Sequence, residues 1–172
     1  MALLHIYDAS YFLIVQTAQA RNIGHQLPVK DMADFLGALI GLTKGTENFD
    51  QILFETHGSS GHIAFNGEGL GAKGLRQLKS LGLHRFVGEN SRIYFNGCNV
   101  AEGNDGWDFL KAAAEVFLNG KSGQVFGQTS AGIGNPFNGH VVHLWGSTRV
   151  LYVDAGGRVI ERFEQPEGIS RF

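Results

Sequence analysis

Two apolar runs, QILFET at 51–56 and RIYFN at 92–96, decide the fold of this chain, because each one leads directly into a residue that can do chemistry. The first run is followed by His57-Gly58 and the second by Gly97-Cys98. Short continuous apolar runs are typical of strands buried in a parallel sheet. Ligands of such sheets bind beyond the carboxyl ends of the strands. We therefore expect His57 and Cys98 to meet at one edge of the sheet.

The rest of the chain alternates between strand and helix patterns, which predicts an α/β fold with a mostly parallel central sheet and a C-terminal β-hairpin. Helices are expected from Pro28 to Leu42, over Leu70–Leu81, and over Gly106–Leu118 with Asp105 as the N-cap. The further expected strands are Leu3–Tyr7, Phe12–Val15, His62–Phe65, Gln124–Gln128, His140–Trp145 and a hairpin of Val150–Val153 with Arg158–Phe163.

Length and composition indicate one domain spanning residues 1–172. The chain has 43% hydrophobic residues, 14 basic and 16 acidic residues, and a net charge of −2. Proteins that bind nucleic acids through many phosphates usually carry a basic face, so a nucleic-acid partner is not expected. No apolar run reaches the roughly 18 residues of a membrane span, and the first residues lack the basic region of a signal peptide. We expect no membrane association.

The single cysteine, Cys98, excludes an intramolecular disulfide and favours a reducing compartment. A cytoplasmic location is expected, with export as an effector without a classical signal peptide as the alternative. An ordinary thiol has a pKa of about 8.5, so a nearby imidazole is needed to make the thiolate available at neutral pH. His57 can take that role, and the backbone N–H groups of Gly58 and Cys98 can stabilise an oxyanion.

The pattern from His57-Gly58-Ser59-Ser60-Gly61-His62-Ile63, through the turn Asn66-Gly67, to Arg92-Ile93-Tyr94-Phe95-Asn96-Gly97-Cys98 resembles the caspase-like fold of cysteine peptidases (clan CD). The following CNVAEG and alanine-rich segment is more similar to the bacterial CHAT branch, and the resemblance covers about residues 50–130. It implies a caspase-like three-layer sandwich and a cysteine endopeptidase with a His57–Cys98 dyad. Gly58 would contribute to the oxyanion hole, the substrate would be a protein or peptide, and no metal or organic cofactor is implied.

The resemblance also suggests where substrate would bind. The strand after the alanine-rich helix would pair with substrate through its edge, and Thr129, Ser130 and Ala131 after it would form the pocket wall. Asn96 stands where relatives that cut after basic residues often have an acid. The cleavage preference, the need for an activator and the oligomeric state therefore stay open.

Other interpretations of the same residues remain. Cys98 is also compatible with a buried structural thiol, in which case the domain would be a catalytically inactive interaction module. The segment Gly69–Gly74 matches GxGxxG and could open a nucleotide-binding helix. His140 and His143 are three apart, which on a strand places them on opposite faces and disfavours a shared metal. Four acids, Asp8, Glu55, Glu102 and Asp105, could each orient His57.

Overall fold

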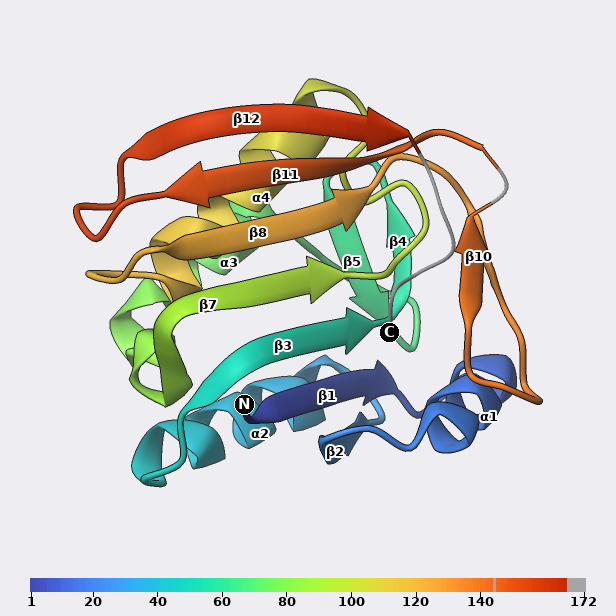
Figure 1. Cartoon of the computed structure of the whole chain (residues 1–172). Helices are drawn as coiled ribbons and strands as arrows, with labels where there is room; N and C mark the ends of the chain where they lie inside the picture. Colours follow the sequence, from blue (N-terminus) through green and yellow to red (C-terminus); the bar gives the residue numbers. More distant parts are fainter. Residues whose placement is uncertain (144, 167–172) are drawn as a thin grey trace.

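A seven-stranded sheet organises the computed structural model, which describes residues 1–143 and 145–166 (Figure 1). Its strand order is β12-β11-β8-β7-β3-β1-β2. The strands are β1 (Leu3–Asp8), β2 (His25–Val29), β3 (Phe49–Glu55), β7 (Val87–Phe95), β8 (Gly123–Gln128), β11 (Ser147–Val153) and β12 (Val159–Pro166). The five from β2 to β8 run parallel, and the β11–β12 hairpin is antiparallel. The predicted mostly parallel α/β sheet with a C-terminal hairpin is confirmed.

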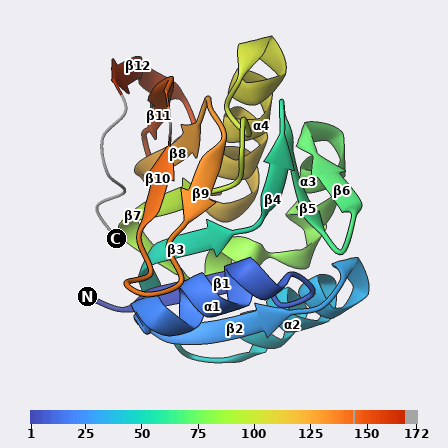
Figure 2. The same ribbon diagram turned by 90° about the vertical axis from the view of Figure 1, so that its right-hand side faces the viewer.

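Helices flank this sheet unequally. Three of them, α2 (Met32–Lys44), α3 (Ala72–Gln77) and α4 (Gly103–Phe117), lie on one face, whereas α1 (Phe12–Arg21) lies on the other, next to β1 (Figure 2). Two short 3-10 helices, η1 (Leu78–Leu81) and η2 (Leu83–Phe86), follow α3. Right-handed crossovers place α1 and α2 on opposite faces of the sheet. The connection from β1 to β2 runs outward, and the connection from β2 to β3 runs back across β1, so the same handedness puts the second helix on the other side.

The core lies between the sheet and α2, α3 and α4. Alternate residues of the central strands point to that side, so they form one cluster with the apolar stripe of α4. Its members include Leu4, Ile6, Ile52, Phe54, Ile93, Phe95, Phe109, Leu110, Ala113 and Phe117, all essentially inaccessible.

Two small sheets stand at the carboxyl edge of the parallel strands. One is the antiparallel sheet β4 (His57–Ser59), β5 (His62–Phe65) and β6 (Glu68–Gly71). The other is the β9–β10 hairpin, formed by β9 (Gly132–Gly134) and β10 (Val141–His143). Both lie toward the end of the sheet where β1, β3 and β7 terminate (Figure 1). This edge therefore has walls on two sides.

The structure corrects several sequence predictions at the N-terminal end. Phe12–Val15 is the start of α1 and not a strand, and its apolar residues do not signal burial, since Phe12 is 70% exposed. The strand β2 was not predicted. Pro28 lies inside β2 and not at a helix start; it is tolerated because, among the described residues, β2 is an edge strand that pairs only with β1. Asp31 caps α2 instead, accepting from the Asp34 amide at 2.8 Å.

Three other predicted boundaries also shift. The region Leu70–Leu81 divides into the end of β6, the six-residue α3 and η1. The helix α4 begins at Gly103, so Asp105 lies in its first turn and is not the N-cap. The predicted strand His140–Trp145 is reduced to β10, and its residue Leu144 lies outside the described residues. No helix in the described ranges is long and apolar enough to cross a bilayer.

Candidate active site

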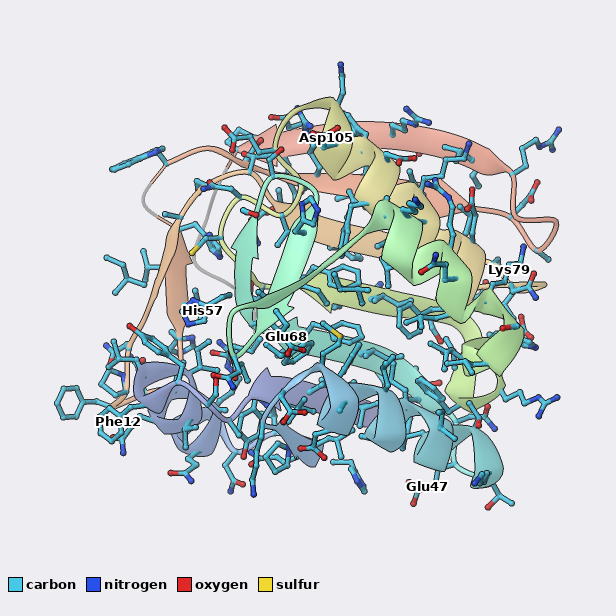
Figure 3. All side chains as sticks on the ribbon, turned by 180° about the vertical axis from the view of Figure 1, so that it is seen from behind. Phe12, Glu47, His57, Glu68, Lys79 and Asp105 are labelled. Atoms are coloured by element: carbon cyan, nitrogen blue, oxygen red, sulfur yellow. The ribbon has the colours of Figure 1, made fainter. Side chains whose placement is uncertain are left out.

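His57 and Cys98 follow two adjacent strands and line the same pocket. β3 ends at Glu55, two residues before His57, and β7 ends at Phe95, three residues before Cys98. A backbone hydrogen bond joins the ends of β3 and β7, because the Asn96 amide donates to the Phe54 carbonyl at 2.8 Å. His57 is the first residue of β4, and Figure 3 shows it at the side of the small β4–β6 sheet that faces the β9–β10 hairpin. The sequence prediction that these two residues meet at one sheet edge matches this geometry.

The pocket has a volume of about 230 Å³. Its lining comes from four segments: the start of α1, the end of β3, the loop after β7, and the β9–β10 hairpin. The lining residues are Tyr11, Leu13, Ile14, Thr17, Glu55, Thr56, His57, Asn96, Cys98, Gly132, Ile133, Gly134 and Val141.

Two glycines, Gly58 and Gly97, allow the loops that carry His57 and Cys98 to pack with their backbones in contact. A Cβ on residue 58 would lie 2.6 Å from the Cys98 carbonyl oxygen and 3.1 Å from the Cys98 nitrogen. A Cβ on residue 97 would lie 3.2 Å from the His57 carbonyl oxygen and 3.3 Å from the Gly58 Cα. Real side chains do not tolerate such contacts without movement. The His-Gly and Gly-Cys pairs are therefore required by the close packing of the two loops.

The His57 side chain is exposed and packs edge-on against Tyr11, with ring centroids 4.4 Å apart. In the part of the chain that the structure describes, its imidazole has no hydrogen bond or ion pair. The ring is therefore held mainly by the aromatic contact, and its nitrogens are available to a neighbouring group. Catalytic hydrogen bonds are often long before substrate binds, so this arrangement is compatible with a base role.

The Cys98 thiol is half-buried and lies against β9. The Gly132 amide donates to its sulfur at 3.4 Å, and the sulfur lies 3.8 Å from the Gly132 carbonyl oxygen. The β9–β10 hairpin itself rests on Thr17 of α1, because a Cβ on Gly134 would overlap the Thr17 hydroxyl. The hairpin therefore covers one side of the thiol.

A buried charged cluster supports the floor of the pocket. His5 Nε2 lies 2.9 Å from the Glu55 carboxylate, and the Arg21 guanidinium lies 3.6 Å from it. Arg21 Nε also donates to the Gly139 carbonyl at 2.7 Å, which ties the connecting loop of the β9–β10 hairpin to α1. Burial lowers the pKa of Arg21, and the charge of Glu55 opposes that effect.

The four acids considered as partners for His57 have other roles. Asp8 accepts from Ser10 and from the Asn66 amide at 3.3 Å, and Glu55 belongs to the buried cluster. Glu102 precedes α4, and Asp105 lies in its first turn. None of the four bonds to His57 in the described ranges, so none of these carboxylates orients its imidazole.

The predicted substrate residues fall partly at the pocket. Asn96 lines it, whereas Thr129, Ser130 and Ala131 are not among its lining residues, and the next three residues of the chain, Gly132–Gly134, are. Thr129 bonds to Ser147 and joins the sheet to β11. The strand β8 is internal, between β7 and β11, so it has no free edge for substrate. Sequence reasoning also missed Tyr11 and the β9–β10 hairpin.

The glycine motif at 69–74 does not form a nucleotide loop of the expected kind. Gly69 and Gly71 lie in β6 of the small antiparallel sheet, and Gly74 lies inside α3, which has only six residues. A dinucleotide fingerprint needs a parallel strand, a tight turn and a long helix. These elements are not assembled around Gly69–Gly74.

A family model described as a domain of unknown function, DUF4347, matches residues 17–121, which is more than half of the chain. The matched region contains His57, Cys98 and most of the parallel sheet. No curated protein and no solved structure matches the chain.

Proposed function

We propose that the chain, which belongs to the DUF4347 family, is a cysteine endopeptidase with Cys98 as nucleophile and His57 as general base. We further propose that its fold is caspase-like and closest to the bacterial CHAT branch. The observation that carries the proposal is that His57 and Cys98 come from adjacent parallel strands and line one pocket, with their loops in backbone contact.

The proposed reaction has two steps. His57 takes the proton from the Cys98 thiol, and the sulfur attacks the carbonyl carbon of a peptide bond. The carbonyl oxygen becomes an oxyanion that accepts hydrogen bonds from backbone N–H groups of Gly58 and Cys98. His57 then gives its proton to the leaving amine, and an acyl-thioester remains. Water, deprotonated by His57, cleaves the thioester and restores the thiol.

A non-catalytic interaction module is the second candidate. It is favoured by one observation, the Gly132 amide that bonds to the Cys98 sulfur at 3.4 Å. If this contact is permanent, substrate has no access to the sulfur, and the domain would act by binding alone.

Thiol reactivity separates the two candidates. The wild-type protein is treated with iodoacetamide at pH 6, and labelling of Cys98 is followed by mass spectrometry. A dyad predicts faster labelling than free cysteine, because an imidazole-paired thiolate persists below the ordinary thiol pKa of about 8.5. His57→Ala should slow the labelling, whereas His62→Ala, which removes another exposed histidine, should not. Labelling of Cys98 only after denaturation would exclude the peptidase.

Peptide hydrolysis tests the full proposal. The protein is incubated with a diverse peptide library, and new termini are identified by mass spectrometry. Cleavage by the wild type that is lost in Cys98→Ala and in His57→Ala is expected. Equal cleavage by wild type and Cys98→Ala would show that another group or a contaminant is responsible.

A further inference from the structure

The pocket beside Cys98 gives information about substrate choice. Resting on the proposed peptidase function, we infer that this pocket receives an uncharged, apolar side chain of at least leucine size, belonging to the residue whose carbonyl Cys98 attacks. This residue is the one closest to the sulfur in any productive complex, and the pocket begins at the sulfur and at His57.

The walls of the pocket are predominantly apolar. Leu13 and Ile14 come from α1, and Ile133 and Val141 come from the β9–β10 hairpin. Tyr11, whose ring contacts His57, also lines the pocket. Exposed apolar side chains that gather at one concave site are a common mark of a binding site, and Leu13 and Ile133 are 46% and 59% exposed.

Away from His57, the side chains of Thr17, Asn96 and Thr56 offer little hydrogen bonding to a ligand. The Thr17 hydroxyl already donates to the Leu13 carbonyl at 2.8 Å. Asn96 Nδ2 and Thr56 Oγ1 have no hydrogen-bond partner among the described residues, but both atoms are buried and nearly inaccessible. A polar side chain would therefore lose its bonds to water and gain few in return.

The charges at the floor cancel, which disfavours lysine, arginine, aspartate or glutamate in the pocket. Glu55 lines the pocket, but its carboxylate is only 5% exposed and is held by His5 and Arg21. The permanent charge of Arg21 neutralises Glu55, so the pocket offers no unpaired carboxylate to a basic side chain. Arg21 is not among the lining residues, so an acidic side chain also finds no partner.

The size of the pocket limits its occupant to one side chain. Its volume of about 230 Å³ lies below the roughly 300–1,000 Å³ that is typical of sites for whole small molecules. A leucine, methionine or phenylalanine side chain can fill such a space, whereas alanine leaves most of the apolar wall in contact with water.

Labelling with substrate-like inhibitors tests this inference without requiring turnover. Matched acetyl-dipeptide chloromethyl ketones ending in Leu, Phe, Ala, Lys or Asp are reacted with the whole protein, and alkylation of Cys98 is timed by intact mass. We expect the Leu or Phe probe to react about 10- to 200-fold faster than the Ala probe, and the Lys and Asp probes to be as slow as Ala or slower.

A second measurement uses a variant that places a negative charge at the edge of the pocket. Ile133→Glu should raise the rate for the Lys probe relative to the Leu probe. Ile160→Glu is the matched control, since Ile160 on β12 is also 59% exposed but does not line the pocket, and it should leave the ratio unchanged.

The outcomes separate the two proposals. Rapid labelling with equal rates for all probes, or fastest labelling by Lys or Asp, would overturn the apolar pocket and leave the peptidase intact. An unchanged ratio in Ile133→Glu would also overturn the pocket. No labelling of Cys98 by any probe would overturn both the pocket and the peptidase.

Discussion

The main-chain amide of Gly132 donates a hydrogen bond to the sulfur of Cys98 across 3.4 Å, although the two residues are 34 positions apart. The contact makes the β9–β10 hairpin a direct neighbour of the reactive atom. The position of this hairpin depends on α1. Gly134 packs on Thr17 of that helix, and Arg21 at its end bonds to Gly139. One side of the thiol is therefore covered by a segment that belongs to neither β3 nor β7.

Displacing this hairpin should expose the sulfur. In Gly134→Ala the new methyl group overlaps the Thr17 hydroxyl, so the hairpin must move away from α1. A loss of 1–2 kcal/mol in hairpin stability corresponds to about a 5- to 30-fold larger open population. We expect iodoacetamide to label Cys98 faster by a comparable factor. The added substitution Thr17→Ala makes room for the methyl group and should restore the wild-type rate; faster labelling in the double variant would contradict the steric explanation.

The contact between the His57 and Cys98 loops should be intolerant of a single methyl group. Gly58→Ala places a Cβ 2.6 Å from the Cys98 carbonyl oxygen and 2.5 Å from Val100. We expect a loss of about 1–3 kcal/mol in the free energy of unfolding, as for other overpacked sites, together with loss of peptide cleavage.

Gly37→Ala serves as the control for that experiment. Gly37 lies within α2, and a Cβ there meets nothing within 4 Å. Alanine should stabilise the helix by about 0.5–1 kcal/mol. Urea unfolding followed by circular dichroism measures both variants, and equal stabilities for Gly58→Ala and wild type would show that the loops are less tightly packed than described.

The buried cluster should be sensitive to the loss of one charge. Glu55→Gln leaves Arg21 buried without a counterion, which is expected to cost about 3–5 kcal/mol of stability. Adding Arg21→Met removes the uncompensated charge and should recover much of the loss. Glu47→Gln, at an exposed position, should change stability by less than about 0.5 kcal/mol. Denaturant unfolding of the four proteins provides the comparison.

Acidification should loosen the β9–β10 hairpin through His143. This ring is buried in the hairpin, and burial lowers its pKa below the ordinary 6.5, although a bond to the Ser130 carbonyl opposes the shift. The unfolded chain therefore binds a proton at a higher pH than the folded chain does, and stability falls as the pH drops below 6.5. Hydrogen exchange of the hairpin amides, corrected for intrinsic rates, should increase between pH 7 and pH 5. His143→Gln should weaken that dependence, and an unchanged slope would assign it to another group.

The central strands β1, β3, β7 and β8, the C-terminal hairpin and the helices α2 and α4 could be predicted from the sequence because their signals are local, whereas β2, β4, β6 and β9 could not. Local patterns indicate one core: the apolar runs before His57 and Cys98, and the apolar stripe of α4. The structure places all three in that core. The prediction of a strand at Phe12–Val15 was wrong because these apolar residues form the start of α1 beside the pocket, where Phe12 is exposed. Apolar residues at the surface of a pocket carry the same local pattern as those in a core.

The pocket itself was only half predictable. The placement of His57 and Cys98 at one sheet edge follows from two strand ends in a parallel sheet, a rule that needs no distant information. The contributions of Tyr11 and Ile133 depend on how α1 and the β9–β10 hairpin fold back over the sheet edge. The short strands β9 and β10, of three residues each, lack a periodic signal, so their pairing becomes visible only in three dimensions.

The pocket is made from residues as far apart as Tyr11 and Val141. A growing polypeptide on the ribosome has its histidine and its cysteine long before it has the last wall of the pocket. The pocket is therefore complete only after β10 has been synthesised and has folded onto the sheet edge.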